Sequence, residues 1–164
     1  MIQVRITGLN AALNRLALST ERTKKAHAVG LTEVALAVRN LAVQEIQGGR
    51  KSGATYGDHQ ASAPGEAPAS DTGNLASSIA VVKAEPGETA RAIVRVKAEY
   101  GWYLEYGTSR PSDNGTDQGK DRRISIVEPR PFMEPSVRSV MPWANAMIQK
   151  RIMAAMRGEE GGDE

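Results

Sequence analysis

The sequence predicts an α+β fold in which a small antiparallel sheet packs against a long N-terminal helix and a C-terminal helix, with two long flexible loops. Apolar residues follow a helical period towards both ends of the chain, and β-rich runs separated by turn residues lie between them. With 164 residues, 40% of them hydrophobic, the chain is expected to form a single domain over 1–157. The acidic end, 158–164, is expected to be a disordered tail.

The N-terminal part predicts a short strand followed by helical structure. Apolar residues alternate with polar ones, the period of a strand with one buried face, at Ile2, Val4 and Ile6. From 9 to 47 the apolar residues are spaced by three and four, which predicts one or two amphipathic helices. Whether a break separates two helices is open, because 19–21 offers a helix cap and Gly30 is a weak point.

Two stretches, 48–74 and 107–123, contain almost no large apolar side chains and are predicted to be long flexible loops. Loops of such length in a compact domain are usually functional or disordered. Two interpretations follow. Either a partner supplies the contacts that order these loops, or the loops are merely tolerated.

A short helix and a hairpin are predicted between the two loops. Residues 71–72 can cap a helix whose apolar residues, Leu75 and Ile79, lie four apart on one face. Two β-rich runs around a turn then predict a hairpin over 81–96. Together with the N-terminal strand, this hairpin would form the small antiparallel sheet.

Aromatic side chains concentrate in a single stretch that predicts a short helix closed by Gly107. The chain contains one Phe, four Tyr and two Trp, and this stretch holds four of them: Tyr100, Trp102, Tyr103 and Tyr106. So high a local density of aromatic residues indicates a packing centre or an interface.

The C-terminal part predicts a β-prone run at 124–127 and then a helix that opens at Pro135 and ends near Met156. Pro142 is expected to bend this helix or delay its start. One face of the helix carries an apolar stripe that consists of Val137, Val140, Met141, Ala144, Met147, Ile148 and Ile152.

The residues that carry catalytic or metal chemistry are sparse. The chain has no cysteine, and its two histidines, His27 and His59, lack acidic or histidine partners at ligand spacing, so no metal site is expected. No Gly-x-Ser-x-Gly elbow is present, and a carboxylate pair such as Glu105 and Asp113 is no more than any acid-containing chain offers. We therefore predict no enzyme, no catalytic residue and no cofactor.

Charge and hydropathy bear on two further classes of function, nucleic-acid binding and membrane association. The net charge of +2 is too balanced to predict nucleic-acid binding by itself. A nucleic-acid-binding module that uses Lys24, Lys25, Arg50 and Lys51 nevertheless remains an alternative, although no aromatic residues interleave with these cations. The chain start has no signal-peptide pattern and no apolar run is long enough to span a bilayer, so we expect a soluble protein without a membrane partner.

Three segments, taken in order, carry a resemblance to a known family: Thr72–Leu75, Tyr100–Thr108 and Pro129–Pro135. An aromatic helix that ends in Glu-Tyr-Gly-Thr is followed by Arg-Pro-Phe and a C-terminal helix. In this arrangement the chain resembles the bacteriophage head-tail joining or neck family, which includes the minor tail protein Z-like tail-completion proteins. The segment between Thr108 and Pro129 is longer than this family leads us to expect.

The resemblance implies an α+β fold, no cofactor and a structural role in the virion of a tailed phage or prophage. The protein would form a ring at the head-tail junction or tail terminus, needed for tail completion and head-tail joining. A cyclic ring of roughly six or twelve copies would contact head-closure or connector proteins and tail terminator or tail tube proteins. The expected location is the neck or tail of the virion, and the host cytoplasm during assembly.

The candidate interface or packing residues lie in the last two motifs and are Tyr100, Trp102, Tyr103, Glu105, Tyr106, Gly107, Arg130 and Phe132. Glu105 and Arg130 would either pair across the turn or face solvent. Candidates for facing DNA in the ring lumen are Arg50, Lys51, Arg122 and Arg123. A further alternative is a small cell-wall hydrolase, for which Glu105 would have to be essential.

Overall fold

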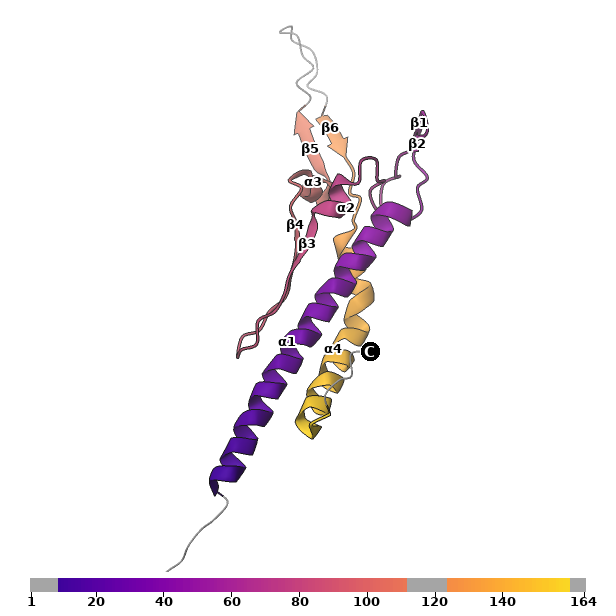
Figure 1. Cartoon of the computed structure of the whole chain (residues 1–164). Coiled ribbons are helices and arrows are strands. Elements are labelled where there is room, and N and C mark those ends of the chain that lie inside the picture. The colour runs from indigo at the N-terminus through magenta and orange to yellow at the C-terminus, as the bar shows by residue number, and fades with distance from the viewer. Residues whose placement is uncertain (1–8, 112–123, 160–164) are drawn as a thin grey trace, which may run out of the picture. The chain divides into compact units, whose positions relative to one another are not determined.

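The computed structural model of the protein describes residues 9–111 and 124–159 (Figure 1). These residues form, in chain order, α1 (Leu9–Gly48), β1 (Thr55–Tyr56), β2 (His59–Gln60), α2 (Asn74–Ser78), β3 (Ile79–Val82), β4 (Ile93–Val96), α3 (Tyr100–Tyr106), β5 (Thr108–Pro111), β6 (Ile124–Val127) and α4 (Met133–Arg157). The α+β class predicted from the sequence is confirmed. The predicted N-terminal strand at Ile2, Val4 and Ile6 lies outside the described residues.

The chain divides into two compact units, each of which includes part of both long helices. The helical unit contains the described residues within 1–35, 82–93 and 141–164. The central unit contains 36–81 and the described residues within 94–140.

Helix α1 is one continuous helix, so the break left open near 19–21 or Gly30 does not occur. Gly30 is buried in the helical unit, and a Cβ atom placed on it would lie 3.2 Å from Cγ1 of Ile148 in α4. The missing side chain therefore allows α1 and α4 to approach closely at this point, which compensates for the poor helix propensity of glycine.

Polar contacts add to this packing in the helical unit. The guanidinium group of Arg151 on α4 forms a salt bridge with the carboxylate of Glu33 on α1, with Nε 2.7 Å from Oε2. The backbone N–H of Ala84 donates to Oγ1 of Thr32 at 3.0 Å, and the same hydroxyl donates to the carbonyl of Ala28 at 2.9 Å. The outer part of the hairpin is thus attached to α1.

The β structure among the described residues consists of three separate two-stranded sheets, β1-β2, β3-β4 and β5-β6. The β3-β4 pair confirms the predicted hairpin, and β6 confirms the β-prone run at 124–127. Strand β5 lies inside the stretch predicted as a loop and pairs antiparallel with β6, so that Thr108 faces Val127 and Pro111 faces Ile124. The remainder of that loop, 112–123, lies outside the described residues.

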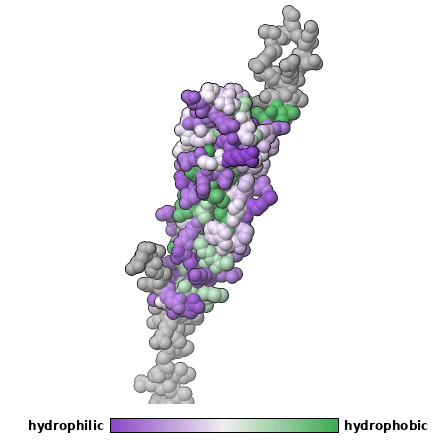
Figure 2. All heavy atoms as spheres, turned by 90° about the vertical axis from the view of Figure 1, so that its right-hand side faces the viewer, coloured by the Kyte–Doolittle hydropathy of each residue, from purple (hydrophilic) through white to green (hydrophobic). Residues whose placement is uncertain are grey.

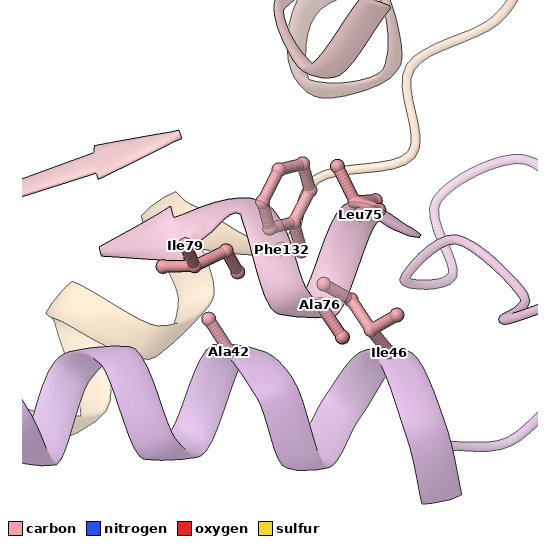
Figure 3. Close-up of a cluster of buried hydrophobic side chains, with 6 residues drawn as sticks. All are labelled: Ala42, Ile46, Leu75, Ala76, Ile79 and Phe132. Carbon is pink, nitrogen blue, oxygen red and sulfur yellow. The ribbon is translucent and has the colours of Figure 1, made fainter. Parts of the chain in front are cut away.

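The core of the central unit forms where α1, α2, β3 and the segment just before α4 meet (Figure 3). Figure 3 shows Ala42 and Ile46 of α1 directed towards side chains from the other three elements. The six buried residues of this cluster are Ala42, Ile46, Leu75, Ala76, Ile79 and Phe132. Small alanines let the backbones approach, while Phe132, only 1% exposed, fills the centre.

Two of the predicted helix details are wrong. The N-cap of α2 is Gly73, with φ of 75° and no capping side chain, so Asp71 and Thr72 do not cap this helix. Helix α4 starts at Met133, before Pro135. Pro142 lies within the helix, so it does not delay the start of α4, and the expected bend stays a prediction.

The apolar stripe predicted for α4 is also only partly correct. Val137 and Met141 are exposed, at 40% and 51%. The buried residues of α4 and of the position just before it are instead spaced by four, and they are Phe132, Ser136, Val140 and Ala144. Ser136 is tolerated on this side because its hydroxyl donates to the carbonyl oxygen of Phe132 at 2.7 Å.

Candidate functional site

Helix α3 presents its aromatic side chains to solvent. Tyr100, Trp102, Tyr103 and Tyr106 are exposed by 46%, 66%, 42% and 61% respectively. The rings of Trp102 and Tyr106, four residues apart, lie with centroids 4.3 Å apart and planes tilted by 50°. We call these four residues the aromatic ridge. Figure 2 shows that, on the face it presents, hydrophobic residues reach the surface among hydrophilic ones.

The opposite side of α3 is used to build the central unit. Leu104 packs against the core cluster, and Gly101 and Glu105 are buried. A Cβ atom on Gly101 would lie 2.7 Å from Cγ1 of Val96, so only glycine lets the helix lie this close to β4. Packing within the unit therefore accounts for the inner side of α3, whereas the four residues of the aromatic ridge remain exposed by 42% to 66%.

Gly107 ends α3 as the sequence predicts. Its φ of 72° lies in the left-handed region, and a Cβ atom here would lie 2.6 Å from the backbone oxygen of Val127 in β6. The chain can therefore turn from α3 into β5 and stay close to β6 only with glycine at this position.

Glu105 caps helix α4 from a distant point in the chain. Its carboxylate accepts hydrogen bonds from the backbone N–H groups of Phe132 at 2.9 Å, Met133 at 3.0 Å and Glu134 at 2.9 Å. The next residue, Pro135, has no N–H group. Since the first four N–H groups of a helix lack partners within it, Glu105 and Pro135 together leave none of them unsatisfied. A carboxylate at this end is also favoured by the helix dipole.

Arg130 holds the extended segment that leads into α4. Its backbone N–H donates to the carbonyl of Leu104 at 2.6 Å, and its guanidinium donates to the carbonyls of Ser62 and Glu128, both at 3.3 Å. The suggested pairing of Arg130 with Glu105 is therefore wrong, because each side chain has other partners. Solvent exposure of Glu105 is wrong as well, since only 9% of the residue is exposed.

Two of the four candidate DNA-facing residues, Lys51 and Arg50, are in the described part, and their side chains differ in contacts and exposure. The Lys51 ammonium group donates to the carbonyls of Glu45 at 3.0 Å and Ala67 at 2.9 Å, next to the end of α1. Desolvation lowers the pKa of Lys51, while the charges of Glu45 and Glu66 act in the opposite direction. The side chain of Arg50 is 87% exposed and lies 4.0 Å from the Glu66 carboxylate. Arg122 and Arg123 lie outside the described residues.

Glu66 organises the segment after α1, a role that the sequence analysis missed. Its carboxylate accepts hydrogen bonds from the Ser52 hydroxyl at 2.6 Å, the Ser52 N–H at 2.8 Å and the Ala63 N–H at 2.9 Å. These bonds, led by that from the Ser52 hydroxyl, hold the pKa of Glu66 below its ordinary value. No periodicity or motif marks this residue, because all its partners come from the irregular chain around it.

Two grooves have a residue of the aromatic ridge in their lining. One, of about 350 Å³, lies between Tyr106 and the β5-β6 pair and has Glu128 as its charged lining residue. The other, of about 200 Å³, is lined by 68–75 together with Tyr100 and Leu104, and its charged residue is Asp71. Both grooves thus combine an aromatic wall with a carboxylate.

Two features are absent from the described ranges, 9–111 and 124–159. Within them, no three or more His, Asp or Glu side chains are placed to hold a metal ion. Nor does any described helix combine the length and apolar character needed to cross a membrane.

Comparison with known families places residues 9–107, more than half of the chain, in a family model described as "Bacteriophage HK97-gp10, putative tail-component". Neither the curated proteins nor the solved structures gave a match. The matched region contains α1 and the aromatic ridge and ends at Gly107, where α3 is closed.

Proposed function

The chain belongs to the HK97-gp10-like family of bacteriophage tail components, and from this membership we propose that it forms a ring at the head-tail junction or tail terminus of a phage particle. In this position it completes the tail and allows head and tail to join. It contributes surfaces for assembly and carries out no reaction.

The observation that carries the proposal is the division of helix α3 into two sides. The inner side, with Gly101 and Glu105, is used in packing and helix capping, whereas the outer side exposes four aromatic rings. Aromatic residues contribute a large share of binding energy at protein interfaces, and clustered exposed apolar side chains mark interaction sites. The ridge is therefore assigned to contacts with other virion proteins.

The ring is cyclic, of roughly six or twelve copies, and closes through contacts between different surfaces of neighbouring copies. Its neighbours are head-closure or connector proteins on one side and tail terminator or tail tube proteins on the other. The segments 48–74 and 107–123 contact these neighbours. Assembly takes place in the host cytoplasm before the protein is incorporated into the virion.

The surroundings of Glu105 support a structural role over the hydrolase alternative. Both carboxylate oxygens accept backbone hydrogen bonds at the start of α4. A general acid or nucleophile must reach a substrate atom, and a carboxylate buried under a helix start is poorly placed for that.

DNA contact in the ring lumen remains a prediction for Arg50, Arg122 and Arg123. Lys51 is a weaker candidate, because its ammonium group is held by two backbone carbonyls. Binding of the isolated monomer to DNA with a steep salt dependence would favour the nucleic-acid-binding alternative over ring formation.

The proposal is tested by mixing the purified full chain with the neck and tail proteins of its phage and measuring masses by mass photometry and electron microscopy. We expect closed rings, or rings docked on these partners. A protein that remains monomeric and binds none of them would contradict the proposal.

A further inference from the structure

The helical unit carries a groove between α1 and α4 that the proposed function has not used. Its volume is about 220 Å³. Small or branched apolar residues, which we call its floor, line the groove together with charged residues, which we call its rim and which are mainly basic. The apolar lining residues are Ala26, Val29, Ala154 and Ala155, and the cations are Arg22, Lys25 and Arg151.

The charge of the rim is only partly neutralised within the chain. Arg151 forms a salt bridge with Glu33. Glu159, the acidic lining residue, forms one with Arg157, which does not line the groove, with Oε1 3.2 Å from Nε. Among residues 9–111 and 124–159, no carboxylate forms a salt bridge with Arg22 or Lys25, and both are exposed. The groove is therefore suited to a partner that is apolar at its centre and acidic at its edges.

The aromatic ridge has this complementary character. Its rings are exposed, and the two grooves that Tyr106 and Tyr100 help to line have Glu128 and Asp71 as their charged residues. Aromatic rings fit an apolar floor, and both ring faces and carboxylates attract arginine and lysine side chains. Every copy of the chain carries both surfaces.

We propose that the aromatic ridge of one copy docks into the α1-α4 groove of a second copy. This inference rests on the proposed ring and identifies the two surfaces through which its subunits meet. Because different surfaces meet, the contact is heterologous, and each copy bound on one side still offers its other surface to the next. Such a contact produces a closed ring when the rotation between neighbours closes.

The test uses two full-length variants, each with one damaged surface. Trp102→Arg places a positive charge on the ridge, and the double change Arg22→Glu with Lys25→Glu reverses the charge of the groove rim. Since all three side chains are exposed, both variants should keep the fold, which circular dichroism verifies. Each variant alone should need at least about tenfold more protein to self-associate, as expected for an interface hot spot.

Mixing the two variants is the decisive step. Each retains the surface that the other lacks, so an equimolar mixture should form a one-to-one dimer and stop there. The matched controls are Tyr56→Arg, at an aromatic residue 70% exposed outside the ridge, and Lys150→Glu, at an exposed cation that does not line the groove. Both should assemble like the wild type.

A cross-linking measurement provides an independent readout, since the chain contains no cysteine. Tyr106→Cys is on the ridge, and Val29→Cys is 45% exposed in the groove. Under mild oxidation, the mixture should give disulfide-linked dimers, while each variant alone should give few. Equal yields from either variant alone would overturn the heterologous contact.

The outcomes separate this inference from the proposed function. If the wild type forms rings and the ridge and groove variants form them equally well, the docking surfaces are wrong but the ring stands. A wild type that does not assemble even with its phage partners contradicts both. A mixture that shows no rescue, although each variant alone is folded and monomeric, also contradicts the docking.

Discussion

The side chain of Glu105 replaces a local cap that helix α4 lacks. Phe132, the residue immediately before the helix, has a side chain without any hydrogen-bond acceptor, and its ring is buried in the core. An acceptor from outside the helix is therefore needed, and Glu105 supplies it from 27 residues earlier in the chain. This contact links the helix that bears the aromatic ridge to the start of α4.

Replacing Glu105 should destabilise the fold. Glu105→Ala leaves three backbone N–H groups without their acceptor, and we expect a loss of about 2 to 3 kcal/mol in the free energy of unfolding. Glu105→Gln keeps one acceptor oxygen and should lose about half as much. Urea unfolding measures both, with Glu99→Ala at an exposed residue as control. Unchanged stability of Glu105→Ala would refute the capping role.

At Gly107, the cost of a left-handed backbone conformation can be separated from the cost of a steric clash. Gly107→Ala combines a left-handed φ with a clash against the Val127 backbone oxygen, so we expect a loss of at least about 2 kcal/mol. Gly57→Ala is the matched control, because Gly57 has φ of 61° with open space around it, and its cost should be nearer 1 kcal/mol. Equal unfolding midpoints for the two variants would mean that the close approach to β6 is unimportant.

Glu66 should make the stability of the fold depend on pH. Its pKa is lowered in the folded state, so its contribution is fully present above the ordinary glutamate pKa of 4.5 and is lost as pH falls through the folded value. Thermal melts from neutral to acidic pH should show a flatter decline for Glu66→Gln than for wild type. The same change at exposed Glu85 serves as the control. Parallel pH curves for Glu66→Gln and wild type would exclude this contribution.

At the scale of single residues, the sequence showed which positions are important better than it showed which residues they contact. Gly107 was expected to end a helix and Phe132 to be an interface or packing residue, and both expectations follow from local chemistry. The roles of Glu105 and Glu66 depend on which backbone N–H groups the fold brings to them. No spacing in the sequence specifies those contacts.

Among the elements, those with a strong local period were predictable. The two long helices, the hairpin and the short aromatic helix all follow from the spacing of apolar and turn residues. Strand β5 was missed because Thr108–Pro111 shows no apolar alternation and is a strand through its pairing with β6. Val137 and Met141 were assigned to a buried stripe because periodicity gives the width of an apolar face but not the part that packing covers.

Helix α4 contains two prolines in very different positions. Pro135 lies in the first turn, where a missing N–H is harmless, while Pro142 lies inside the helix and removes an internal hydrogen bond. Pro142→Ala should therefore raise the free energy of unfolding by about 1 to 3 kcal/mol. Pro135→Ala, the control, should give no comparable gain. A destabilised Pro142→Ala variant in calorimetry would show that the fold requires the proline.

On the scale of the whole molecule, stability and assembly are expected to depend on different side chains. The core cluster, Glu105 and Gly107 maintain the fold, whereas the residues of the aromatic ridge are exposed by 42% to 66%. The sequence alone marked the aromatic stretch as either a packing centre or an interface. The exposure of its rings now favours the interface, a choice that composition could not make because it depends on which side of α3 is covered.

The most direct test of this assignment is electron microscopy of particles made by the phage when its only copy of the protein carries Trp102→Ala. We predict a purified variant with the unfolding midpoint of the wild type, and lysates in which heads and tails remain largely unjoined or tails incomplete. Joined, infectious particles in wild-type numbers would contradict the role of the aromatic ridge in virion assembly.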